Sequence, residues 1–252
     1  MKQLAHFNEV SVDLPVYGHH GQLMKAKIFQ WATGGTLKRE ARRKVIVKAL
    51  DKVTLTFHEG ARIGLVGHNG AGKTTLLRAL SGVYEPSQGQ VTTWGKVTAL
   101  FDVLFGVHEE LTGRENLLLR GSLEGLSRKE VRGIEKKVVE WAHLGDYFHM
   151  PLRSYSNGMK LRLGFALATA VARPDIFLFD EIVGIGDREF QREAKNHLRT
   201  IIDQANLVVL ASHDLSIIRE MCDQVVWLRR GRVAFFGPVD EGLERYQKEV
   251  GC

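Results

Sequence analysis

The chain has 252 residues, 44% of them hydrophobic and 25% charged, a balance typical of a globular protein with a substantial buried core, and its formal net charge of +6 leaves nucleic acid, anionic membrane surfaces and nucleotide phosphates open as partners. Its longest strongly apolar stretch, residues 164–172, is shorter than the roughly 18 residues that cross a bilayer, and its start does not resemble a secretory signal. Two cysteines are too few for a disulfide framework, so we expect a cytoplasmic protein.

The predicted elements begin with a strand over residues 6–17, where apolar and polar residues alternate. A basic segment follows at residues 18–44, with seven Lys or Arg against a single acid. Residues 45–57 predict a strand, a turn and a second strand, and residues 61–67 predict a buried strand that leads into a glycine-rich loop. A helix should begin at that loop.

Helices and strands alternate through the rest of the chain. The pattern predicts surface helices over residues 114–141 and a packed helix over residues 161–172. Two short apolar runs, residues 176–180 and 207–212, suit buried strands of a parallel sheet, with a polar helix over residues 188–203 between them. This alternation is typical of an α/β fold.

The end of the chain predicts a β-hairpin over residues 225–237, with its turn at Arg230 and Gly231. The sequence contains no repeat and no low-complexity segment. For a chain of this length, one domain with room for a subdomain is therefore expected.

The strongest chemical motif is GHNGAGKT, in which two glycines are separated by four residues and followed by Lys73 and Thr74. Such glycines let backbone N–H groups face inward around an anion, and the following helix adds the positive end of its dipole. Lys73 is expected to reach the β- and γ-phosphates of a nucleotide and Thr74 to bind Mg²⁺. The alternative, a chance glycine turn, is disfavoured by the predicted strand before it and helix after it. The predicted nucleotide-binding residues of this loop are Gly67, His68, Asn69, Gly70, Ala71, Gly72, Lys73, Thr74 and Thr75.

Two carboxylates follow the predicted strand at residues 176–180. Asp180 is expected to hold Mg²⁺ through water, and Glu181, one residue further along, to polarise the attacking water. An exposed acidic pair that caps a strand is the alternative, which the presence of a phosphate-binding loop disfavours.

Residues 154–181, SYSNGMKLRLGFALATAVARPDIFLFDE, resemble the signature motif of ABC ATPases, its helix and the following Walker B strand. Ser156 and Gly158 match the serine and second glycine of the signature, whereas Asn157 and Met159 replace its usual glycine and glutamine. The resemblance implies that these four residues bind the ATP of an opposite subunit. A serine followed by backbone N–H groups at a helix start also suits a second phosphate cradle.

The same resemblance assigns roles to isolated residues. His213 matches the switch histidine that contacts the γ-phosphate, and Asp187 matches the aspartate of the D-loop. Asp102 replaces the Q-loop glutamine that touches Mg²⁺, and an exposed turn aspartate is the alternative. The adenine-stacking aromatic should come from the first strand, where the aligned residue is Leu14, so Tyr17 is the substitute candidate.

The resemblance covers roughly residues 7–237 and implies an α/β fold, an ABC-type P-loop ATPase core with a mixed sheet, an antiparallel β edge and a helical signature subdomain. The whole chain is then a single nucleotide-binding domain. Its predicted parts are a core at about 7–106 and 172–237, a helical subdomain at about 107–171, the basic insertion at 18–44 and a C-terminal helix at 238–252.

Within the family, the NGM signature, Asp102, the LTGREN motif and the basic insertion resemble polysaccharide exporters, those of O-antigen above all. This implies an ATP- and Mg²⁺-dependent homodimer at the cytoplasmic face of the inner membrane, joined to two copies of a permease that moves a lipid-linked polysaccharide. Capsule or teichoic acid is an alternative cargo. A soluble nucleic-acid- or ribosome-associated ATPase is the alternative of another class; the single cassette without extended heptads disfavours it, so no nucleic acid is expected.

The basic insertion carries apolar residues between positions 23 and 31. They suit a short amphipathic element at the membrane surface, and they suit equally a helix packed on its own domain.

Overall fold

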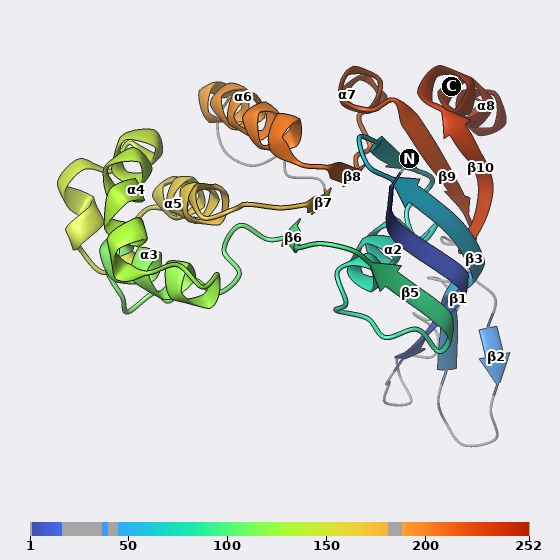
Figure 1. Cartoon of the computed structure of the whole chain (residues 1–252), viewed down its shortest axis with the longest axis horizontal. Helices are drawn as coiled ribbons and strands as arrows, with labels where there is room; N and C mark the ends of the chain where they lie inside the picture. Colours follow the sequence, from blue (N-terminus) through green and yellow to red (C-terminus); the bar gives the residue numbers. More distant parts are fainter. Residues whose placement is uncertain (1, 17–36, 40–44, 181–187, 252) are drawn as a thin grey trace. The chain divides into compact units, whose positions relative to one another are not determined.

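The structure is a computed structural model, which describes residues 2–16, 37–39, 45–180 and 188–251 (Figure 1). The chain forms two compact units, one of residues 1–99, 175–181 and 206–252, and the other of residues 100–174 and 182–205. Tyr17, Glu181, Asp187 and the apolar residues of the basic insertion lie outside the described residues, so their predicted roles stay predictions.

The first unit contains two β-sheets (Figure 1). One sheet is antiparallel, with strand order β2-β3-β1-β5. The other has the order β10-β9-β4-β8-β7-β6, in which β9, β4, β8 and β7 are parallel and β10 pairs antiparallel with β9 at one edge. This mixed sheet with an antiparallel edge confirms the predicted α/β fold class. The strands are β1 (Gln3–Val16), β2 (Leu37–Arg39), β3 (Val45–His58), β4 (Arg62–Val66), β5 (Gln88–Thr93), β6 (Val97–Leu100), β7 (Ile176–Asp180), β8 (Leu207–Ala211), β9 (Gln224–Arg229) and β10 (Arg232–Pro238).

The parallel strands form the core of this unit because their side chains are apolar on both faces. Every residue of β8 is buried, as are Ile176, Phe177, Leu178 and Phe179 of β7. The helix α2 (Lys73–Leu80) packs against strands of both sheets, namely β3 and β5 of one and β7 and β8 of the other. The described part of this unit also contains the helices α7 (Leu215–Met221) and α8 (Val239–Val250).

One prediction is wrong, because residues 45–57 do not form two strands with a turn between them. The strand β3 runs unbroken from Val45 to His58 and pairs with β1 along its length. Lys52 has a left-handed φ of 50°, and its backbone N–H donates to Ser11 Oγ over 3.1 Å, where the register between β1 and β3 shifts. The charged residues that suggest a turn therefore mark a β-bulge.

The second unit is helical. Its elements are α3 (Gly113–Leu123), α4 (Arg128–Ala142), η1 (Gly145–His149), η2 (Leu152–Ser154), α5 (Asn157–Ala170) and α6 (Arg188–Gln204). Capping boxes begin α3, through Thr112 and Glu115, and α4, through Ser127 and Glu130, which fixes where both helices start. Buried side chains of α3, α4, α5 and the two short 3-10 helices form one apolar cluster, which includes Phe148. Among the residues that the structure describes, no helix has the length and apolar character needed to cross a bilayer.

Candidate functional site

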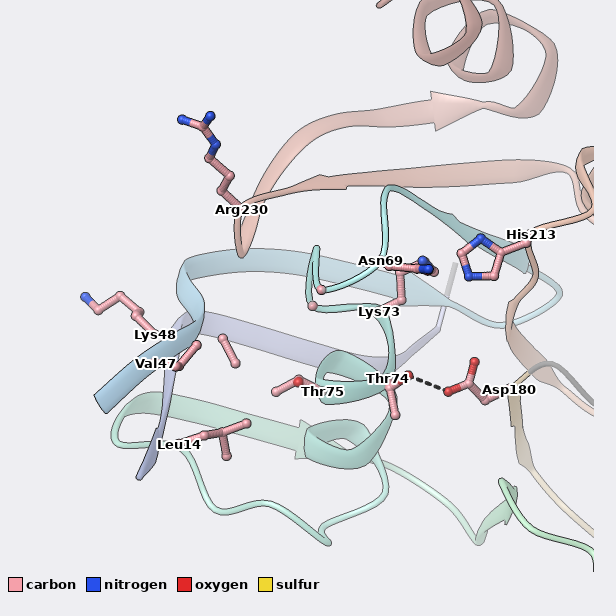
Figure 2. Close-up of a pocket in the computed structure, with 13 residues that line it drawn as sticks. Leu14, Val47, Lys48, Asn69, Lys73, Thr74, Thr75, Asp180, His213 and Arg230 are labelled. Atoms are coloured by element: carbon pink, nitrogen blue, oxygen red, sulfur yellow. Dashed lines mark hydrogen bonds between the residues drawn. The ribbon is translucent and has the colours of Figure 1, made fainter. Parts of the chain in front are cut away.

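The glycine-rich loop joins the end of β4 to the start of α2 (Figure 2). Gly67 has a φ of 146°, and a Cβ there would lie 2.4 Å from the backbone oxygen of Leu228. Gly72 has a φ of 110°, and a Cβ there would lie 2.7 Å from the backbone oxygen of Ala49. Only glycine fits at these two positions, because a side chain would meet both a strained backbone and a neighbouring carbonyl.

Lys73 begins α2 and is only 7% exposed. Its ammonium donates to the backbone oxygens of Gly67, over 2.7 Å, and His68, over 3.3 Å. The positive charge is therefore held inside the loop, beside the N-terminus of a helix whose dipole also favours anions.

Thr74 and Asp180 bring a hydroxyl and a carboxylate together next to the loop. Thr74 Oγ1 donates to Asp180 Oδ2 over 2.6 Å, and Asp180 ends the buried strand β7 (Figure 2). Mg²⁺ prefers hard oxygen ligands and is commonly held by one or two protein groups, substrate phosphates and water. These two oxygens fit that requirement.

The loop borders a pocket of about 280 Å³ within the first unit. Of the residues predicted from the sequence, the structure brings together Asn69, Gly70, Gly72, Lys73, Thr74, Thr75, Asp180 and His213 in its lining. His213 follows β8 and lies on the same side as Asp180 in Figure 2. The lining also contains Leu14, the residue aligned with the family's stacking aromatic.

Sequence reasoning missed four residues of this lining: Val47, Lys48, Ala49 and Arg230. The first three belong to β3, and Arg230 lies in the turn between β9 and β10. No local motif marks them, since they reach the pocket only through the packing of distant strands. The basic side chain of Arg230, in the predicted hairpin turn, was the one available clue.

In the second unit, Ser156 is the N-cap of α5, and its Oγ accepts a hydrogen bond from the backbone N–H of Met159 over 3.3 Å. The helix thus begins at Asn157, before the predicted residue 161, with the signature residues in its first turn. A Cβ built at Gly158 would find only Ser156 Oγ, 4.0 Å away, so nothing within the described chain requires a glycine there.

Tyr155 fixes the start of this helix from inside the unit. It is 6% exposed, and its hydroxyl donates to the backbone oxygen of Tyr147 over 2.5 Å. Burial raises the pKa of Tyr155 to about 12, against the lowering effect of a hydrogen bond from Gly113. The ring therefore stays neutral and acts as a structural tether.

Asp102 also belongs to the second unit. It is exposed, and its Oδ1 accepts a hydrogen bond from the backbone N–H of Leu104 over 2.9 Å, the arrangement of an Asx turn. The LTGREN motif has a structural basis nearby, because Thr112 and Glu115 form a capping box and the buried side chain of Asn116 bonds three backbone oxygens.

The site has the phosphate-binding arrangement of P-loop proteins: a buried strand, a glycine-rich loop, a lysine at the start of a helix and a hydroxyl–carboxylate pair. The fold and the pocket therefore define this chain as a P-loop nucleotide-binding domain.

Comparison with known proteins narrows this class. The sequence pattern of the family described as ABC transporter matches residues 50–184. The chain is 37% identical over 227 residues to the O-antigen export system ATP-binding protein RfbE of Yersinia enterocolitica, which covers 90% of this chain and 95% of that protein. It is 34% identical to the corresponding protein RfbB of Klebsiella pneumoniae, over 99% of this chain and 100% of that one.

A solved structure described as the ATP-binding cassette MJ0796, dimeric, in a post-hydrolysis state and bound to ADP and phosphate, has the same fold. Its TM-score is 0.67 at 20% identity, over 94% of this chain and 99% of that one. The chain belongs to the ABC transporter family, as an ATPase domain that uses ATP with Mg²⁺.

Proposed function

We propose that this chain hydrolyses ATP to drive the export of a lipid-linked polysaccharide, O-antigen foremost, through a permease encoded on a separate chain. The observation that carries this proposal is the likeness to O-antigen export ATP-binding proteins over their whole length. Capsule and teichoic acid are alternative cargoes. The chain is proposed to lie at the cytoplasmic face of the inner membrane, as a peripheral subunit of this exporter.

The pocket residues divide the chemistry between them. The backbone N–H groups of the loop and Lys73 bind the phosphates, and Thr74 and Asp180 would hold Mg²⁺. When bound, the metal draws negative charge from the phosphoryl group that is transferred. His213 contacts the γ-phosphate, and Glu181 is the general base that orients and polarises the attacking water.

Lys73 changes partners when the nucleotide binds. In the structure its ammonium bonds the carbonyl oxygens of Gly67 and His68. A phosphate oxygen is a stronger partner for an ammonium than a neutral carbonyl, because both partners are charged. Lys73 therefore exchanges these carbonyl oxygens for the β- and γ-phosphates.

The signature residues act on a second copy of the chain. The start of α5 is capped and contains a glycine with open space around it; its signature residues are Ser156, Asn157, Gly158 and Met159. In a head-to-tail dimer this surface meets the ATP held by the partner. Asp187 joins the same interface, and Asp102 lies on the segment that faces the permease. ATP binding closes the dimer and hydrolysis reopens it.

The general base is tested by Glu181→Gln. This variant should bind ATP with unchanged affinity, lose nearly all turnover and accumulate as an ATP-bound dimer, measured by calorimetry, phosphate release and gel filtration. Glu244→Gln, the same chemical change on the exposed face of α8, is the matched control. Normal turnover in Glu181→Gln would reject Glu181 as the base.

The transport role is tested by recovering a tagged copy of the chain from detergent-solubilised native membranes and identifying the bound protein by mass spectrometry. A polytopic membrane protein is the expected partner, and cells that carry Lys73→Ala should accumulate lipid-linked glycan. Recovery of ribosomal or DNA-bound proteins instead, with salt-sensitive nucleic-acid binding, would leave the ATPase intact and reject export.

A further inference from the structure

The nucleotide pocket has an aliphatic end. Leu14 and Val47 line it on the side away from Asp180 (Figure 2). Among the described residues, His213 is the only aromatic residue in the lining, and it lies at the opposite end, near Asp180. Of the residues that the structure describes, those that a nucleobase meets at this end of the pocket therefore offer methyl groups.

Arg230 borders this pocket from an unfavourable backbone position. The turn between β9 and β10 has φ values of 51° at Arg230 and 77° at Gly231, the left-handed pair of a type I′ turn. Asn, Asp and Gly are favoured at the first of these positions because they tolerate a left-handed backbone, whereas a long side chain is disfavoured. The presence of an arginine at this position points to a use for its side chain.

The turn is fixed to the phosphate loop by backbone hydrogen bonds. The N–H of Gly231 donates to the backbone oxygen of Ala71 over 3.0 Å, and the carbonyl of Gly231 accepts from the N–H of Asp51 over 2.9 Å. A Cβ at Gly231 would lie 2.8 Å from the backbone oxygen of Ala49. The base of the Arg230 side chain is therefore held at a constant position beside the pocket.

The charges around the turn leave Arg230 available. Asp51 pairs with two other cations near the turn, since its carboxylate lies 2.8 Å from Lys48 Nζ and 2.6 Å from a guanidinium nitrogen of Arg232. With the residues that the structure describes, Arg230 makes no ion pair, hydrogen bond or ring contact. Its side chain is exposed and extends outward from the turn in Figure 2, and exposed side chains change rotamer within nanoseconds.

We propose that Arg230 is a nucleotide-binding residue that folds over the nucleobase, with its guanidinium against the π face and Leu14 and Val47 against the opposite side. A cation above an aromatic face is attracted by the ring quadrupole. This proposal rests on the ATP site of the proposed function. Because a π face is common to all purines, this contact strengthens the binding of GTP as well as that of ATP.

The test compares Arg230→Asn with the wild-type chain by calorimetry, using ATP, GTP and inorganic tripolyphosphate in the presence of Mg²⁺. Asparagine suits the type I′ turn, so the melting temperature should not fall. The affinity for ATP and GTP should drop by about twofold to thirtyfold, while that for tripolyphosphate stays unchanged. Arg229→Asn removes the same charge from the neighbouring residue, which pairs with Glu249 over 2.9 Å and does not line the pocket, and should leave all three affinities unchanged.

Three results would overturn the proposal. Unchanged ATP affinity in Arg230→Asn would show that the guanidinium does not touch the nucleotide. Equal losses for ATP and tripolyphosphate would place Arg230 on the phosphates instead of the base. A wild-type chain that binds tripolyphosphate but neither ATP nor GTP would reject base recognition together with the proposed ATP site.

Discussion

Replacing Gly158 with alanine should stabilise the chain and strongly reduce its ATP turnover. Gly158 is exposed in the first turn of α5, and a Cβ there would meet only Ser156 Oγ at 4.0 Å. Alanine is favoured over glycine in a helix by about 0.5–1 kcal/mol. For a protein of this size, that gain raises the melting temperature by about 1–4 °C.

The activity should change in the opposite direction. In the proposed dimer, the open side of Gly158 faces the partner's ATP, so an added methyl group displaces the phosphates from the N–H groups of the helix start. A misplacement of about 1 Å at a reacting centre reduces the rate by roughly a hundredfold, and we expect a loss of about that size in ATP turnover.

The assay measures ATP hydrolysis and thermal melting on the same preparation. Gly133→Ala is the matched control, because Gly133 is exposed in α4 and a Cβ there would find no atom within 4 Å. It should raise the melting temperature similarly and leave hydrolysis unchanged. A Gly158→Ala protein that is more stable and fully active would refute the argument that this face contacts a nucleotide.

Three further changes test the packing. Tyr155→Phe leaves the backbone oxygen of Tyr147 without its hydroxyl donor and should lower the free energy of unfolding by about 1–2 kcal/mol in urea titrations. Unchanged stability would contradict the role of Tyr155 as a structural tether. Burial lowers the pKa of His197, so its neutral form contributes stability that is complete above its unfolded pKa of about 6.5 and is lost as the pH falls. His197→Gln should therefore flatten the decline of the melting temperature between about pH 7 and pH 5. An identical decline in the variant and the wild type would contradict this role of His197. Gly242→Ala would put a Cβ 2.1 Å from Val225 Cγ1 and should cost about 1–3 kcal/mol in thermal melts, so a neutral effect would show that α8 can move away from β9.

Secondary-structure elements that are determined by their own residues could be predicted from the sequence. A local sequence pattern determines each of three such elements. An apolar run predicts the strand β7, a pair of turn residues predicts the hairpin of β9 and β10, and the spacing of glycines predicts the glycine-rich loop. The bulge in β3 could not be predicted, since its charged residues at 51 and 52 resemble a turn. They are instead held by Ser11 on β1 and by Arg232 on β10, contacts with no local signature.

The same distinction applies to the pocket. The phosphate end is local in character, because the loop supplies most of its groups in consecutive residues. The end at Leu14, Val47 and Arg230 is assembled from β1, β3 and the turn after β9, so its residues could be identified only once the strands were packed. The boundaries predicted for the helical subdomain stay a prediction.

The alignment of the phosphate site depends on strand register rather than on the site residues themselves. In the parallel sheet, Ala211 of β8 pairs with Leu65 of β4 on one side and with Asp180 of β7 on the other. These three residues therefore lie at the same height along their strands. The groups that follow or end these strands, namely the glycine-rich loop, Asp180 and His213, therefore emerge at one edge of the sheet. A slip of one residue in β7 would turn Asp180 to the opposite face and remove the carboxylate from Thr74. Buried apolar residues such as Leu178 and Val209, which touch no ligand, thus determine whether a magnesium site can exist at all.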